Sequence, residues 1–180
     1  MNIQPLFSTV EREKIFTYLI YHFEEGISLH KIAREVGVSP SQVHKYVSIL
    51  KDMRFVQDNK LLDSPLIRSL RLVENLLQLR KERVVNFLKK SIPSAEGIGI
   101  YGSWAKGSNT GDADLDIWIK VSKAPDDLTL AKTRRTLEKK LGVVVDLTPI
   151  TPEKFEYLKK KNPPFYFSLC NSTRLWGEKL

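Results

Sequence analysis

One segment constrains the fold of this chain more than any other, the alternating run from Asp114 to Val121. Every second residue from Leu115 onward is aliphatic, and the positions between them begin with Asp114 and Asp116. Because side chains of a strand alternate between its two faces, the run predicts a strand with one apolar face and one acidic face. Two carboxylates on one face repel each other unless a cation or a proton lies between them. Trp118 shares the acidic face, either as a packed aromatic or as a platform for a nucleobase.

The segments on either side of this strand predict an α+β domain with a small mixed sheet. Residues 96–101 are typical of a short buried strand, and Gly102-Ser103 follow as a small turn. Residues 126–141 are helical in pattern, and residues 143–147 form an apolar strand interrupted by Asp146. A buried, unpaired carboxylate costs several kcal/mol, so this acid needs a partner. If its strand lies beside the acidic strand, three carboxylates converge.

Such a site suits a triphosphate carried by divalent metal ions. The amides of Gly102-Ser103 stand at a strand–helix junction, where a helix N-terminus attracts phosphate, and glycine permits a close approach. Carboxylate oxygens are hard ligands that select Mg²⁺ or Mn²⁺. Two such ions would activate an attacking oxygen and stabilise a leaving pyrophosphate.

The stretch GSWAKGSNTGDADLDIWIKV resembles the signature of the nucleotidyltransferase superfamily. The likeness to its minimal members in size and layout covers about residues 78–180, and the domain itself is expected over residues 96–180. The resemblance implies that Gly102, Ser103 and Lys106 hold the nucleotide. It implies that Asp114, Asp116 and Asp146 are the catalytic and metal-binding residues, with Mg²⁺ or Mn²⁺ as cofactor. Two positions depart from the family: Ala113 stands where serine is frequent, and Lys106 where arginine is frequent.

The first third of the chain predicts three helices and a small hairpin. The helices are expected over residues 10–23, 29–36 and 39–53, with Gly26 and Gly37 as breaks, and the hairpin over residues 55–62. Val43, Tyr46, Val47 and Leu50 should be the buried face of the third helix. Its exposed face should carry Ser41, Gln42, His44 and Lys45.

The segment SLHKIAREVGVSPSQVHKYVSILKDMRFV resembles the winged helix-turn-helix family. The resemblance rests on Ile32-Ala33, on the turn Gly37-Val38-Ser39, and on the apolar positions of the third helix. It implies a domain over residues 1–63 that binds DNA through Ser41, Gln42, His44 and Lys45. The alternative is a winged helix used only for protein contacts, and the zero net charge of residues 1–63 favours it.

Residues 64–95 carry seven basic and two acidic side chains, so much of the net charge of +8 lies in this segment. Neither proline nor glycine occurs between Pro65 and Pro93, which predicts one helix or two abutting helices. The apolar spacing at positions 66, 70, 73 and 77 is heptad-like. The segment is therefore either a connecting helix packed on both domains or the seam of a homodimer over residues 66–88.

Composition argues against disulfide-stabilised, zinc-binding and membrane-spanning classes of protein. The single Cys170 excludes an internal disulfide framework, and we expect it to be a small buried side chain. Three scattered histidines leave no His/Cys metal cluster. No apolar run approaches the roughly 20 residues of a membrane span, and the first residues lack a signal-peptide pattern, so the expected location is the cytoplasm without a membrane partner.

Together these patterns predict an enzyme with an N-terminal DNA-binding domain. Its activity would be metal-dependent transfer of a nucleoside monophosphate from a nucleoside triphosphate to an unidentified acceptor. A second hypothesis is a DNA-binding regulator whose nucleotidyltransferase fold senses a nucleotide without turning it over. A third, which follows from the family resemblance, is an antitoxin-type protein that pairs with a helical toxin.

Overall fold

The N-terminal unit of the computed structural model, Met1–Arg71, consists of helices and one short hairpin. The structure describes residues 4–180, so residues 1–3 of the predicted domain 1–63 lie outside it. The elements of this unit follow the predicted order and are the 3₁₀ turn η1 (Gln4–Leu6), α1 (Val10–Tyr21), α2 (Leu29–Val36), α3 (Pro40–Asp52), β1 (Val56–Gln57) and β2 (Lys60–Leu61).

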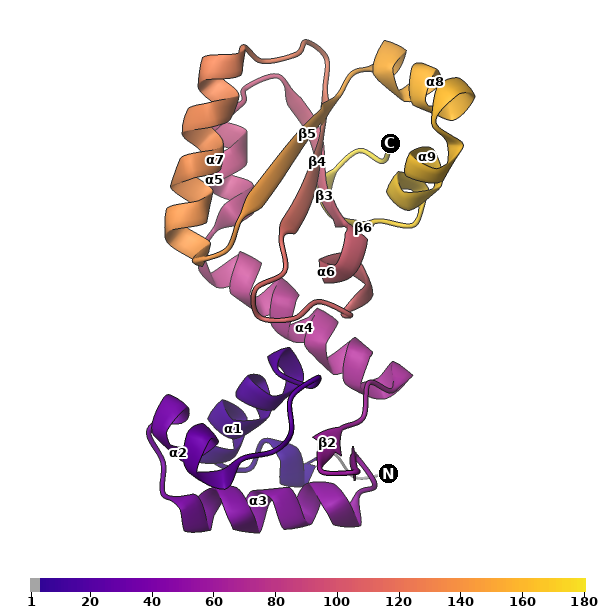
Figure 1. Ribbon diagram of the computed structural model, residues 1–180. Helices are drawn as coiled ribbons and strands as arrows, with labels where there is room; N and C mark the ends of the chain where they lie inside the picture. The colour runs from indigo at the N-terminus through magenta and orange to yellow at the C-terminus, as the bar shows by residue number, and fades with distance from the viewer. Residues whose placement is uncertain (1–3) are drawn as a thin grey trace. The chain divides into compact units, whose positions relative to one another are not determined.

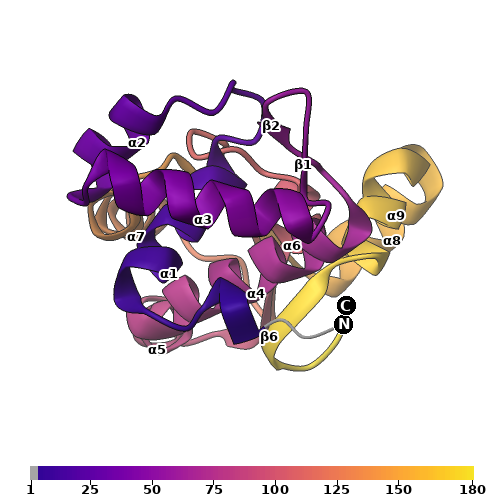
Figure 2. The same ribbon diagram turned by 90° about the horizontal axis from the view of Figure 1, so that it is seen from below.

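Local capping explains where α2 ends and where α3 begins. Gly37 ends α2 with a left-handed φ of 71°, a conformation that costs glycine least. Ser39 then caps α3 through a capping box, in which its hydroxyl accepts from the Gln42 amide and the Gln42 side chain accepts from the Ser39 amide. The hairpin lies near the C-terminal end of α3 (Figure 2), and paired backbone and side-chain bonds join its Asn59 to Ile27.

The predicted connecting segment 64–95 forms two helices, α4 (Pro65–Lys81) and α5 (Val84–Ser91). They meet at Arg83, which takes a left-handed φ of 54°. The division between the two compact units falls inside α4, between Arg71 and Leu72. Val73 and Leu77, two of the heptad-like positions, are 52% and 53% exposed. A homodimer over residues 66–88 remains a prediction.

The C-terminal unit, Leu72–Leu180, is built on a four-stranded mixed sheet with the order β5-β4-β3-β6. The pair β4–β5 is parallel, and the other two pairs are antiparallel. Beyond α4 and α5, its elements are β3 (Ala95–Tyr101), α6 (Gly102–Lys106), β4 (Leu115–Val121), α7 (Asp127–Leu141), β5 (Val145–Ile150), α8 (Pro152–Lys161), α9 (Pro163–Cys170) and β6 (Thr173–Gly177).

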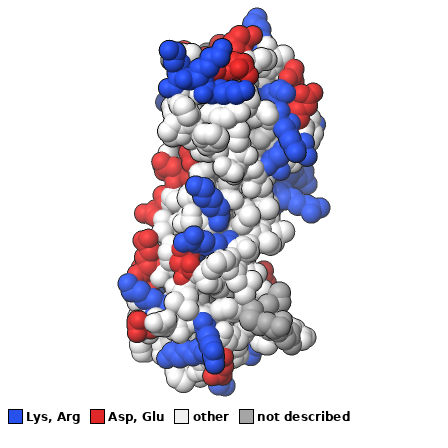
Figure 3. All heavy atoms as spheres, turned by 90° about the vertical axis from the view of Figure 1, so that its right-hand side faces the viewer, with Lys and Arg blue, Asp and Glu red and all other residues white. Residues whose placement is uncertain are grey.

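The two faces of this sheet have different covers. The aliphatic residues of β3, β4 and β5 pack with Leu88 of α5 and Leu137 of α7, while α8 and α9 lie on the opposite side (Figure 1). On that opposite side Tyr101 and Trp118 form a smaller cluster with Leu158 of α8 and with α9. Seen from the side of α8 and α9, uncharged surface lies between groups of basic side chains (Figure 3). Asp114 is exposed and Asp116 is half-buried, so the acidic face of β4 is only partly covered.

Two expectations about single residues are wrong. β5 begins at Val145, and because it is the edge strand of the sheet, the side chain of Asp146 is 51% exposed rather than buried. Cys170 is exposed at the end of α9. Of the two alternatives for Trp118, the structure has the packed aromatic: the side chain is 1% exposed and its indole N–H donates to Ser172 Oγ at 2.8 Å.

Among the helices of residues 4–180, none combines the length and the apolar character required to cross a bilayer.

Candidate active site

The parallel pairing of β4 with β5 brings two of the predicted acids together. Asp116 and Asp146 are direct register partners, and Tyr101 of β3 is the partner of Asp116 on its other side. All three point away from the core formed with α5 and α7. Asp114 lies one residue before β4 begins and is exposed. The sheet therefore gathers acids from two strands on the face that α8 and α9 cover only in part.

The backbone of Gly102 packs directly against the Asp116 carboxylate. Its φ is 68°, and a Cβ atom added to it would lie 2.2 Å from Oδ2 of Asp116. The carboxylate of Asp116 therefore lies directly over the Gly102 backbone, at a distance that no other residue type permits. Ser103 follows in the first turn of α6, and Lys106 is exposed at the end of this helix. The predicted nucleotide-binding residues thus begin where the acids converge.

The acids perturb one another and the tyrosine between them. The pKa of Asp116 is raised, first by burial and then by the negative charges of Asp146 and Asp114. Burial raises the pKa of Tyr101 to about 12, and the negative charges of Asp116 and Asp146 also oppose its ionisation. Tyr101 is therefore a neutral hydroxyl at physiological pH. A cation bound beside Asp116 would relieve the repulsion among the three carboxylates.

Asp146 is oriented by three side chains that sequence reasoning did not place at the site. Arg134 of α7 reaches around the edge strand and forms an ion pair with Oδ1 at 3.4 Å. Thr148 donates to Oδ2 at 3.2 Å, and the Tyr101 hydroxyl lies 3.4 Å from the same oxygen. The tyrosine and threonine hydroxyls are 3.1 Å apart.

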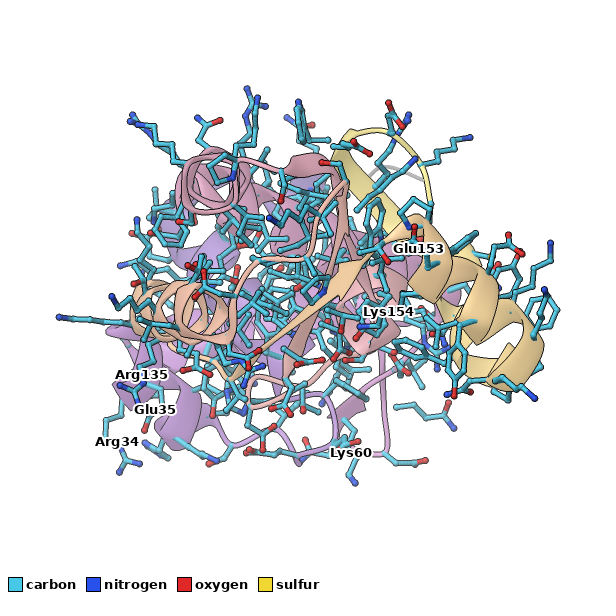
Figure 4. All side chains as sticks on the ribbon, turned by 90° about the horizontal axis from the view of Figure 1, so that it is seen from above. Arg34, Glu35, Lys60, Arg135, Glu153 and Lys154 are labelled. Atoms are coloured by element: carbon cyan, nitrogen blue, oxygen red, sulfur yellow. The ribbon has the colours of Figure 1, made fainter. Side chains whose placement is uncertain are left out.

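The sequence held a signal for two of these three side chains. Thr148 follows Asp146 by two residues and so shares its strand face, and Tyr101 directly precedes Gly102. Arg134 carried no comparable signal, because only the edge position of β5 lets α7 reach the site. Its neighbour Arg135 is exposed on α7 (Figure 4).

A buried asparagine pair, Asn75 and Asn109, connects α4 to α6 and to the loop that precedes β4. Asn75 of α4 is fully buried, and its Nδ2 donates to the Trp104 carbonyl of α6 at 3.0 Å and to Oδ1 of Asn109 at 2.9 Å. Trp104 in turn donates through its indole N–H to the Ala113 carbonyl, next to Asp114. The helix that carries Gly102 and the loop that carries the acids are therefore held in one hydrogen-bonded arrangement.

The donor set fits a hard divalent cation only if the substrate completes the coordination. Within residues 4–180 no group of three His, Cys, Asp or Glu side chains is arranged to hold a metal ion by itself. Mg²⁺ is usually held by one or two carboxylates together with substrate phosphates and water. The raised pKa of Asp116 between two other acids is consistent with such a partly formed site.

The predicted DNA-binding residues lie on the exposed side of α3. Ser41, Gln42, His44 and Lys45 are all exposed. Gln42, however, is already engaged, because its side-chain oxygen accepts from the Ser39 amide at 2.9 Å. It caps its own helix, so its carbonyl oxygen is not available to a base edge.

Comparison with known proteins gives a family model that matches within the C-terminal unit and a relative of known name. A family model described as "Nucleotidyltransferase domain" matches residues 81–169. A protein of Methanocaldococcus jannaschii named "Putative protein adenylyltransferase MJ0128" is 33% identical over 82 residues, which cover 46% of this chain and 81% of that protein.

Solved structures match at lower sequence identity than this relative. A tri-AMPylated Shewanella oneidensis HEPN toxin in complex with MNT antitoxin matches with a TM-score of 0.42 at 20% identity, covering 58% of this chain and 73% of that chain. A toxin–antitoxin crystal structure with AMP-PNP matches with a TM-score of 0.43 at 21% identity, covering 53% and 71%.

Proposed function

Because this chain belongs to the nucleotidyltransferase family, we propose that it transfers AMP from ATP to a hydroxyl group of a protein. The observation that carries the proposal is the carboxylate of Asp116, which lies over Gly102 and beside Asp146. ATP as donor and a protein as acceptor are inferred from the name of the M. jannaschii relative. The broader form of the proposal is transfer of a nucleoside monophosphate to an acceptor that is still to be identified.

The reaction requires one bond to form and one to break at the α-phosphorus. The acceptor oxygen attacks this phosphorus, the bond to the oxygen that bridges to the β-phosphate breaks, and pyrophosphate leaves. We assign the hydroxyl proton to the carboxylate of Asp146, which is exposed to an incoming acceptor and oriented by Arg134 and Thr148. Tyr101 stays neutral and supports the orientation of the same carboxylate.

Gly102, Ser103 and Lys106 would hold the triphosphate, with the lysine as a single point charge. Asp114 and Asp116 would hold Mg²⁺ or Mn²⁺ together with the phosphates, and Asp146 would contribute to a second ion. When bound, such ions neutralise phosphate charge and polarise the reacting oxygens.

The test is label transfer by the purified full chain. The protein is incubated with α-labelled ATP, Mg²⁺ and a cell extract, and labelled protein and released pyrophosphate are measured. Asp116→Asn should lower both signals at least about 100-fold, a loss typical of a group that stabilises transition-state charge. Asp127→Asn, the same change at an exposed position on α7, should leave both unchanged. Equal rates for wild type and Asp116→Asn would contradict the assignment.

A nucleotide-sensing regulator is the second candidate, and the exposed side of α3 favours it. We propose that residues 1–63 are a winged helix-turn-helix domain that binds DNA through Ser41, His44 and Lys45, with Gln42 capping the helix. Lys45→Ala should weaken binding to duplex DNA, and Lys14→Ala, an equal charge loss on α1, should not. Binding should also fall steeply with salt. If the full chain shows no DNA affinity at low salt, the N-terminal unit is better explained as a protein-contact module.

The two candidates differ in turnover. A sensor binds metal–triphosphate but releases no pyrophosphate with ATP, GTP, CTP or UTP, in the presence of either Mg²⁺ or Mn²⁺. The helical toxin expected as a partner remains a prediction, and its test is co-purification with the full chain.

A further inference from the structure

Apart from the candidate active site, a cavity lies in the C-terminal unit where the end of α4 meets α5 and β6. Its volume is about 380 Å³. It is at the β6 edge of the sheet, whereas the acids gather toward the β5 edge. Its walls are mainly aliphatic and include Leu76, Leu79, Val84, Val85 and Leu175. The rest of the lining consists of three arginines, Arg80, Arg83 and Arg174, and of Asn86 and Thr173.

These arginines have no acidic partner in the structure. None of the ion pairs formed within residues 4–180 includes Arg80, Arg83 or Arg174. The hydrogen bond of Arg174 to the carbonyl of Gly177 at 3.1 Å leaves its positive charge uncompensated. Three arginines that line one largely apolar cavity, with no ion pair to an acid of residues 4–180, give this part of the surface a positive potential.

The backbone at Arg83 supports a role for its side chain. Its φ of 54° lies in the left-handed region, where residues with a Cβ atom are strained and glycine is not. Glycine would therefore make the same joint between α4 and α5 with less strain. Backbone conformation alone therefore does not account for an arginine at this position.

We propose that this cavity binds a small amphipathic anion, with a phosphate or carboxylate head held by the arginines and an apolar body against the aliphatic wall. Guanidinium groups bind both head groups through paired hydrogen bonds. The volume falls within the range of small-molecule sites. The site uses different residues from those of the nucleotidyl-transfer proposal and does not depend on it.

Calorimetric titration of the full chain with octyl phosphate and with octanoate tests this proposal. Inorganic phosphate and octanol carry the head and the body separately, and the two amphipathic probes distinguish the two head groups. We expect at least one amphipathic anion to bind at least about tenfold more tightly than either separate part. Arg80→Ala and Arg83→Gly should each weaken that binding about tenfold. The glycine variant is chosen because it relieves the strained φ, so folding is retained.

The matched control removes charge elsewhere. Lys139→Ala with Lys140→Ala takes two positive charges from the last turn of α7, outside the cavity, and should leave binding unchanged. Leu175→Asn should weaken binding of the amphipathic anions but not of inorganic phosphate. The proposal is overturned if neither amphipathic anion binds, if inorganic phosphate binds equally well, or if the lysine variant loses as much affinity as the arginine variants.

Discussion

Replacing Gly102 with alanine tests whether this glycine supports the site. The left-handed φ of 68° should cost alanine roughly 1–2 kcal/mol. The added Cβ would also lie 2.2 Å from Asp116 Oδ2, so the carboxylate must rotate away, which adds roughly 1 kcal/mol of rotamer strain. The sum is about 2–3 kcal/mol, or roughly 8–12 °C in Tm for a unit of this size. Metal-dependent triphosphate binding should weaken at least about tenfold because Asp116 is displaced.

Gly142→Ala is a matched control within the same unit. Gly142 has a φ of 71°, but a Cβ there would meet nothing within 4 Å. This variant should lose roughly 1–2 kcal/mol and bind triphosphate as wild type does. All three tryptophans lie in the C-terminal unit, so tryptophan fluorescence follows its unfolding selectively, and calorimetry measures ligand binding. Equal triphosphate affinity in the two variants would refute the placement of Asp116 over Gly102.

Three further predictions follow from single contacts. Asp146→Asn should bind ATP within about tenfold of wild type but lower the rate of pyrophosphate release about 100-fold or more; an unchanged rate would remove its role as base. Asn75→Ala should weaken triphosphate binding although Asn75 touches no proposed ligand, and recovery on further changing Asn109 to alanine would indicate that an unpaired amide, not lost positioning, was the cause. Asp63 is partly buried, which favours its neutral form, but hydrogen bonds from Arg68 and Arg71 outweigh this and lower its pKa. The stability it contributes is therefore present above about pH 4 and lost as pH falls through its lowered pKa; Asp63→Asn should flatten that acid dependence of the N-terminal unit in circular dichroism, and an unchanged pH profile would contradict this.

The helices and strands could be predicted because local chemistry specifies them. Ser39, Pro40 and Gly37 act on their own turns, so α2 ends and α3 begins where the sequence indicates. Strand alternation likewise placed Asp116 on the face opposite Leu115 and Ile117, as the structure has it. Such patterns require no knowledge of distant contacts.

Burial at particular positions could not be predicted in the same way. The apolar run 143–147 indicated an enclosed strand, but β5 is the edge of the sheet and Asp146 is half exposed. Trp118 lies on the acidic face and yet is enclosed, because Gly99 on β3 leaves room for its ring and Ser172 accepts its indole N–H. Strand order decides both outcomes, and alternation along one strand carries no information about order.

The sequence by itself determined which residue types stand at the site: a glycine that permits close approach, two acids spaced by one residue, and a third acid on a later strand. Only the tertiary structure decided their partners. The parallel register of β4 and β5 aligned Asp116 with Asp146, the edge position of β5 admitted Arg134, and the path of α4 placed Asn75 under the loop before the acids. These contacts join residues from 12 to 34 positions apart, and no local pattern records a pairing at that separation.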